Sequence, residues 1–137
     1  MPDYTPYDVE VITPEGAAFA GQAQMLVVPG SEGELGILDR HAPLISTLDV
    51  GETRIMDEGG ELHRFATGSG FVEVRASEAL VLVDEAVPAE RIDVSDARAR
   101  LERAREDLER ARAGDGDVYR AELEVEVAEN LVRVGGG

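Results

Sequence analysis

The spacing of turn residues is the feature that most constrains the fold of this sequence, because it leaves room only for short secondary-structure elements between Tyr7 and Val87. Short apolar or alternating runs are separated by turn-forming groups about every ten residues, as at 13–16 and 57–60. We find no helical period in this part of the sequence. Such spacing is typical of an all-β sandwich or barrel, and we expect a β-sandwich domain over residues 1–87.

The pattern changes at Pro88. From there, apolar residues recur at steps of three and four, which places them on one stripe of a helix: Val94, Ala97, Leu101, Ala104, Leu108 and Ala111. A glycine-containing break at 114–116 precedes a second series, which begins at Val118. Two amphipathic helices joined by so short a break form an antiparallel hairpin. We therefore predict an α+β chain, with an N-terminal all-β sandwich followed by a C-terminal antiparallel α-helical hairpin over residues 88–137, and a frayed end at Gly135–Gly137.

Charge and composition exclude several classes of function. The formal net charge is -16, and so acidic a surface repels nucleic acid and anionic membranes. There is no cysteine, which excludes disulfides and thiolate chemistry. The N-terminus lacks the basic and apolar regions of a secretory signal, and no apolar run approaches the roughly 20 residues that span a bilayer. We expect a soluble or peripheral protein with no direct membrane insertion.

All 13 basic residues are arginine. Two explanations stay open: a GC-rich genome, or adaptation to high salt, where a dense carboxylate surface keeps proteins in solution. Equal thermal stability in low and in molar salt would contradict the second explanation.

No group of residues indicates catalysis. The segment Gly30–Gly36 lacks the Gly-Lys-Ser ending of a phosphate-binding loop and the spacing of a dinucleotide-binding loop. A triad built on His41 and Asp39 is far less favoured than a structural or interfacial histidine. His41 and His63 fall in separate predicted strands without the acidic spacing of a zinc site. We predict a protein that is not an enzyme and binds no cofactor.

The most distinctive stretch is Val28–Asp49. Its glycines at 30, 33 and 36 lie between apolar runs and predict a tightly turned loop that is defined by its backbone. The strings Pro29-Gly30-Ser31-Glu32-Gly33, Leu35-Gly36-Ile37-Leu38 and His41-Ala42-Pro43-Leu44 resemble the ε subunit of bacterial F-type ATP synthases, which is equivalent to the mitochondrial δ subunit. Gly70–Val74 and Ile92–Leu108 extend the resemblance over nearly the whole chain.

The resemblance implies a non-catalytic rotor subunit of the central stalk, peripheral on the cytoplasmic face of the inner membrane. It would bind the γ subunit and the c-subunit ring, couple rotation to the catalytic head, and regulate ATP hydrolysis through its hairpin, in transient contact with the α and β subunits. By position, the c-ring contact would involve Ser31, Glu32 and Glu34, and the γ contact His41, Ala42 and Pro43.

The first predicted helix carries the regulatory candidates, Arg98, Arg103, Arg105, Arg110 and Arg112. Two interpretations stay open. These arginines either form a solvated face with pairs such as Glu106 with Arg110, or they contact an acidic partner, which the resemblance identifies as the catalytic β subunits.

Some bacterial relatives bind ATP through a motif at the start of this helix, and here the motif is degenerate. Ile92, Asp93 and Ala97 match it, but Asp96 stands where the family has arginine. Because a carboxylate repels phosphate, we expect no micromolar ATP binding. A nucleotide-sensing module and a free-standing β-sandwich interaction module are the alternative functions. Whether the hairpin inhibits hydrolysis, and whether the coupling ion is H⁺ or Na⁺, stays open.

Overall fold

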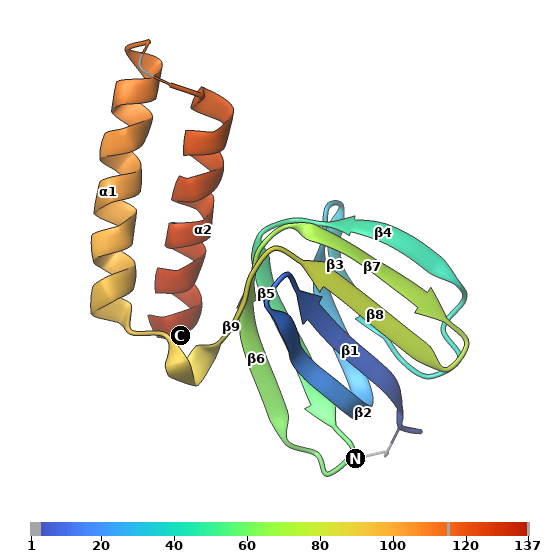
Figure 1. The fold of residues 1–137 in the computed structure, drawn as a ribbon. Helices are drawn as coiled ribbons and strands as arrows, with labels where there is room; N and C mark the ends of the chain where they lie inside the picture. The colour runs from blue at the N-terminus through green and yellow to red at the C-terminus, as the bar shows by residue number, and fades with distance from the viewer. Residues whose placement is uncertain (1–3, 115, 137) are drawn as a thin grey trace. The chain divides into compact units, whose positions relative to one another are not determined.

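The computed structural model describes residues 4–114 and 116–136. The chain divides into two compact units, Met1–Pro88 and Ala89–Gly137. The first is built of strands and the second of helices (Figure 1). Asp115 and Gly137, which belong to the predicted break and the predicted frayed end, lie outside the described residues.

Nine strands form the described part of the first unit, and its predicted β-sandwich is confirmed. The strands are β1 (Tyr7–Thr13), β2 (Gly16–Gly30), β3 (Gly33–Ile37), β4 (Leu44–Leu48), β5 (Gly51–Asp57), β6 (Leu62–Thr67), β7 (Gly70–Arg75), β8 (Glu78–Val83) and β9 (Ala86–Pro88). They are hydrogen-bonded in the order β1-β8-β7-β4-β2-β5-β6-β9, with β3 added to β2.

The long strand β2 joins the two layers of this sandwich. Its first part, Gly16–Ala23, pairs with β1, whereas its second part pairs with β3 and β5. Between β2 and β4 only Gly30 and Leu48 pair. One layer is therefore β1-β8-β7-β4, and the other is β3-β2-β5-β6-β9.

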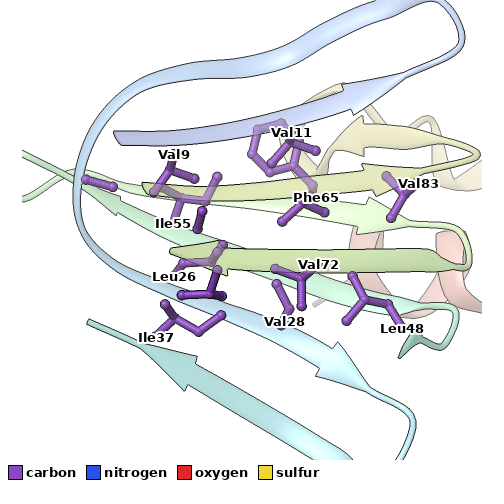
Figure 2. Packing of buried hydrophobic residues seen from close by; sticks show 14 of the residues in the cluster. Val9, Val11, Leu26, Val28, Ile37, Leu48, Ile55, Phe65, Val72 and Val83 are labelled. Carbon is purple, nitrogen blue, oxygen red and sulfur yellow. The ribbon is translucent and has the colours of Figure 1, made fainter. Parts of the chain in front are cut away.

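The core between the layers is largely aliphatic and follows the period-2 alternation of the strands. Figure 2 shows side chains from both layers meeting there, among them Val9, Leu26, Ile55 and Val72, which are fully buried. Tyr7 and Phe65 are the buried aromatic residues of the described chain. A core of this kind fixes which residues of each strand point outward to potential partners.

The second unit is the predicted helical hairpin, which is also confirmed. A short 3-10 turn, η1 (Ala89–Arg91), precedes α1 (Val94–Arg112) and α2 (Val118–Gly136), and the two α-helices pack on each other. Asp93 caps α1, because its side chain accepts a hydrogen bond from the backbone N–H of Asp96. The buried residues of α1 are Ala97, Leu101, Ala104 and Ala111, all on the predicted stripe.

The prediction was less accurate for α2. Val118, the first residue of its predicted stripe, is exposed, and burial is concentrated toward the C-terminal half of the helix, where Ala128 and Leu131 lie. The predicted frayed end is wrong for the described residues, because α2 continues through Gly136. The reason is packing: a Cβ at Gly135 would lie 2.5 Å from Cγ2 of Ile92, so glycine is the residue that lets the two segments approach so closely.

Candidate partner surfaces

The glycine segment is the tip of a β-hairpin rather than one continuous loop. Gly30 and Gly33 pair across the turn, so that Ser31 and Glu32 are its two exposed tip residues. Gly33 adopts φ +128°, and a Cβ at Gly30 would lie 2.7 Å from the Gly33 carbonyl oxygen. Gly36, which was predicted to lie in the loop, instead lies within β3. A Cβ added there would meet no atom within 4 Å, so close packing does not require glycine at this position.

Hydrogen bonds tie this tip to the end of β4. The Ser31 hydroxyl lies 2.8 Å from the Thr47 hydroxyl and donates to the Asp49 carboxylate at 3.3 Å. The Asp49 N–H donates to the Pro29 carbonyl at 2.9 Å. The two tip residues are therefore presented on a turn that is fixed at its base.

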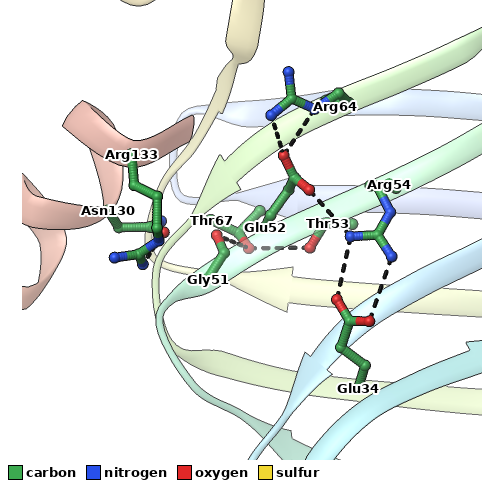
Figure 3. A network of polar contacts seen from close by, with 9 residues as sticks. All are labelled: Glu34, Gly51, Glu52, Thr53, Arg54, Arg64, Thr67, Asn130 and Arg133. Atoms are coloured by element: carbon green, nitrogen blue, oxygen red, sulfur yellow. Dashed lines mark hydrogen bonds and ion pairs between the residues drawn. The ribbon is translucent and has the colours of Figure 1, made fainter. Parts of the chain in front are cut away.

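Glu34, the third predicted c-ring residue, belongs to a charged network across β3, β5 and β6 (Figure 3). The Arg54 guanidinium contacts Glu34 at 3.1 Å and Glu52 at 3.0 Å, and Arg64 Nε donates to Glu52 at 2.8 Å. Arg54 and Arg64 are direct neighbours across β5 and β6, so Glu52 offsets their repulsion. The hydrogen bonds to Glu34 and Glu52 raise the pKa of Arg54, and Glu34 reaches the surface as a paired carboxylate.

The three predicted γ residues follow a strained turn. Arg40 has φ 63°, a left-handed conformation that costs a residue with a Cβ about 1 kcal/mol. The His41 N–H donates to the Leu38 carbonyl at 3.1 Å, which closes the turn, and the Arg40 N–H donates to Ala76 at 2.9 Å. Ala42 and Pro43 are exposed, whereas His41 is half-buried with Nδ1 2.8 Å from the Ala42 carbonyl oxygen.

The candidate arginines of α1 differ in their partners. Arg105 pairs with Glu129 and Arg112 with Glu122, each at 3.9 Å and both across the hairpin, while Arg110 pairs with Asp107 rather than with the predicted Glu106. Across residues 4–114 and 116–136, Arg98 and Arg103 make no ion pair, and both are exposed. These two arginines are the guanidinium groups of the set that are available to an external carboxylate.

The residues of the degenerate nucleotide motif have structural roles in the hairpin. Asp93 accepts the capping bond, Ala97 is buried and donates its N–H to the Asp93 carbonyl, and Ile92 packs on Gly135. Asp96 lies exposed in the first turn of α1. This first turn therefore presents a carboxylate at the position where the motif has a guanidinium.

A cluster that sequence reasoning missed lies at the β5–β6 turn. Atoms of Asp57, Glu61 and His63 lie within 4.8 Å of one another, close enough to hold a metal ion. In the structure, however, Asp57 Oδ2 lies 2.9 Å from His63 Nε2, while Oδ1 accepts the N–H groups of Gly59 and Glu61. The contact with His63 lowers the pKa of Asp57. The turn predicted at 57–60 is the sequence signal that could have indicated that Asp57 lies close to Glu61 and His63.

Taken together, these features define a two-unit protein, a β-sandwich followed by a helical hairpin, with exposed turns and a charged helix as its candidate surfaces. Comparison with known proteins identifies the family. Residues 6–89 match the beta-sandwich domain of the ATP synthase delta/epsilon chain. The chain belongs to this family, and it is a non-catalytic subunit of ATP synthase.

Relatives match over most of their length. The ATP synthase epsilon chain of Desulforamulus reducens is 39% identical over 91% of this chain and 93% of its own. That of Halalkalibacterium halodurans is 41% identical over 93% and 96%. Among solved structures, a chain of the Euglena gracilis mitochondrial ATP synthase (OSCP/F1/c-ring) has the same fold, with a TM-score of 0.75, 23% identity, and coverage of 96% of this chain and 82% of that chain.

A second structure, from the central stalk/c-ring of the Tetrahymena thermophila mitochondrial ATP synthase, matches with a TM-score of 0.57 and 18% identity, over 98% of this chain and 97% of that chain. Within the described residues of this chain, neither α-helix is sufficiently long and apolar to cross a membrane.

Proposed function

We propose that this chain is a central-stalk subunit that binds the γ subunit and the c-subunit ring through its β unit and restrains ATP hydrolysis through its helical hairpin. Its membership of the delta/epsilon family supports the central-stalk position, as do the fold relatives from an F1/c-ring assembly and from a central stalk/c-ring assembly. The chain would then lie peripherally on the cytoplasmic face of the inner membrane.

The observation that carries the regulatory part is the composition of the hairpin seam. Three of the four buried residues of α1 are alanines, and Leu101 is the large one. A buried large aliphatic side chain contributes about 1.5–3 kcal/mol, whereas ordering each residue costs about 1 kcal/mol or more. With so little apolar surface in the seam, the hairpin is only marginally stable by itself. An element of marginal stability can exchange between docked states.

The unpaired arginines of α1 supply the second contact that inhibition of ATP hydrolysis needs. Arg98 and Arg103 lie about 1.4 helical turns apart on α1 and have no intramolecular carboxylate partner among the described residues. A partner that presents acidic side chains would gain charge-assisted hydrogen bonds from them without first breaking a pair. The acidic loops of the catalytic β subunits fit this chemistry.

For the β unit, we assign the c-ring contact to Ser31, Glu32 and Glu34, and the γ contact to His41, Ala42 and Pro43. The support is that Ser31, Glu32, Ala42 and Pro43 are exposed on or beside short turns that are anchored by backbone hydrogen bonds, while Glu34 is exposed on β3 and His41 is half-buried beside its turn. Loops of this kind present side chains at fixed positions, as a rigid rotor contact requires.

The test is ATP hydrolysis by the catalytic core, reconstituted with γ and with variants of this chain. We expect the full chain to inhibit hydrolysis more strongly than a chain that ends at Pro88, which keeps the pairing of β9 with β6. The double variant Arg98→Ala/Arg103→Ala should release inhibition, whereas the matched control Arg105→Ala/Arg112→Ala, whose arginines are engaged across the hairpin, should release less. Equal hydrolysis with the full and shortened chains, both bound to γ, would reject the regulatory role and leave the structural one.

A further inference from the structure

Three side chains with metal-ligating atoms converge at the turn between β5 and β6. Asp57 ends β5, Glu61 lies in the turn, and His63 is the second residue of β6. His63 Nε2 lies 2.9 Å from Asp57 Oδ2 and 3.9 Å from Glu61 Oε2, and the three donor atoms all lie within 4.8 Å of one another. Asp57 and Glu61 precede His63 by six and two residues, so the hairpin turn is what brings the three donors to one point.

The separations of these donor atoms are close to those of a coordination shell. Zinc binds imidazole nitrogen and carboxylate oxygen at about 2.0–2.2 Å, so two donors on one tetrahedral shell lie about 3.4 Å apart. The observed 2.9 Å and 3.9 Å lie on either side of this value. The Glu61 side chain is 76% exposed, and rotation about its bonds can move its carboxylate by the required distance of about 1 Å. The cluster therefore needs only an adjustment of its most exposed member.

The other two members are held in place by contacts of their own. Asp57 Oδ1 accepts the backbone N–H groups of Gly59 and Glu61, each at 2.9 Å, which leaves Oδ2 directed toward His63. The imidazole of His63 packs edge-on against the ring of Phe19 on β2, with 5.3 Å between the ring centroids. Contacts of this kind orient metal ligands and raise the affinity of a site.

The cluster also carries more negative charge than its surroundings balance. In the part of the chain that the structure describes, Asp57 and Glu61 contact no arginine, and His63 is the one group able to carry positive charge beside them. Glu52, by contrast, is paired with Arg54 on the same strand. Two carboxylates therefore face at most one imidazolium. A divalent cation would balance both carboxylates at once.

We propose that Asp57, Glu61 and His63 bind one Zn²⁺ ion or a similar divalent transition-metal ion, with water in the remaining coordination position. The imidazole disfavours Mg²⁺ and Ca²⁺, which prefer shells of oxygen. In the bound form the neutral imidazole carries its proton on Nδ1, so that Nε2 offers a lone pair to the metal. Because the ion joins the end of β5 to the start of β6, its binding stabilises the folded chain.

The experiment is a calorimetric titration of the full chain, freed of metal with a chelator, with ZnCl₂ at about pH 7.5, where an ordinary imidazole is neutral. We expect one ion per chain, and a loss of affinity of about tenfold or more for Glu61→Gln and for His63→Gln. The matched controls are His41→Gln, which removes the other histidine, and Glu58→Gln, which removes a carboxylate of the same turn. Each control should change the affinity by less than about threefold.

Two further measurements distinguish this site from ions that gather on an acidic surface. ZnCl₂ should raise the melting temperature of the unmodified chain but not that of Glu61→Gln, whose exposed position makes a folding defect an unsuitable explanation. In NMR spectra, Zn²⁺ should shift the ring resonances of His63 and leave those of His41 in place. Equal Zn²⁺ affinity of the unmodified chain and both cluster variants would reject the site. Displacement of Zn²⁺ by about 5 mM MgCl₂, or no binding at up to about 1 mM ZnCl₂, would also reject it.

Discussion

Two adjacent glycines at the end of α2 should respond in opposite ways to the same substitution. Both Gly135 and Gly136 are helical, and replacing a helical glycine by alanine ordinarily stabilises a helix, by up to about 1 kcal/mol in its interior and by less near its end. For Gly136 nothing lies within 4 Å of an added Cβ, so Gly136→Ala should show this ordinary gain.

For Gly135 the added methyl group has no room. Its Cβ would lie 2.5 Å from Cγ2 and 2.9 Å from Cβ of Ile92, and 3.3 Å from Cγ2 of Val94. Ile92 has little freedom to move, because it lies between the η1 turn and the cap residue Asp93. Overpacking of this kind costs about 1–3 kcal/mol, so after the helical gain Gly135→Ala should lower the free energy of unfolding by about 1–2 kcal/mol.

The assay is urea unfolding of the full chain, followed by circular dichroism at 222 nm, which reports mainly the two helices. The double variant Ile92→Ala/Gly135→Ala completes the comparison, since Ile92→Ala removes the closest atom. Gly135→Ala should cost about 1 kcal/mol less in that background, which a double-mutant cycle measures directly. If Gly135→Ala stabilised the helices as much as Gly136→Ala does, the close approach of Ile92 and Gly135 would be refuted.

Four further predictions concern the turns, the titrating groups and the degenerate nucleotide motif. Gly30→Ala should lower the free energy of unfolding by about 1–3 kcal/mol, because its Cβ would meet the Gly33 carbonyl, whereas Gly36→Ala has open space and should be neutral or stabilising in urea unfolding. Burial, and then the charge of Asp39, raise the pKa of Tyr7, so as the pH rises the unfolded chain loses this proton before the folded chain does. The free energy of unfolding should therefore fall above about pH 10. Tyr7→Phe, which loses the hydrogen bond to the Ile37 carbonyl, should reduce that fall in unfolding curves from about pH 9 to about pH 11. His63→Gln should raise the pKa of Asp57 toward its ordinary value in an NMR titration, since the contact with His63 is the main cause of the lowered pKa; an unchanged Asp57 titration would contradict this cause. Calorimetry should detect no micromolar ATP binding, and a micromolar dissociation constant would show that Asp96 does not exclude the phosphates.

The sequence by itself determined the two-part architecture, because the evidence for it is local. Turn residues at regular intervals and the three-four spacing of Val94 to Ala111 depend on backbone geometry within a few residues, and each buried residue of α1 lies on the predicted stripe. The family was also readable from the string around Gly30 to Pro43. Close backbone approach at Gly30 and positive φ at Gly33 and Arg40 restrict which residues fit there.

Tertiary structure alone decided which residues far apart in the sequence share a surface. Register between β1, β8, β7 and β4 brings Ile12, Leu82 and Phe71 into one row, and a shift of one residue would have turned them into the core. The pairing of Arg54 with Glu34, 20 residues away, likewise depends on the adjacency of β3, β2 and β5. The same holds for the end of α2, where a glycine that favours fraying by propensity is retained in the helix because Ile92 packs against it. Local propensity contributes fractions of a kcal/mol per residue, and packing contacts of a few kcal/mol outweigh it wherever the fold brings distant segments together.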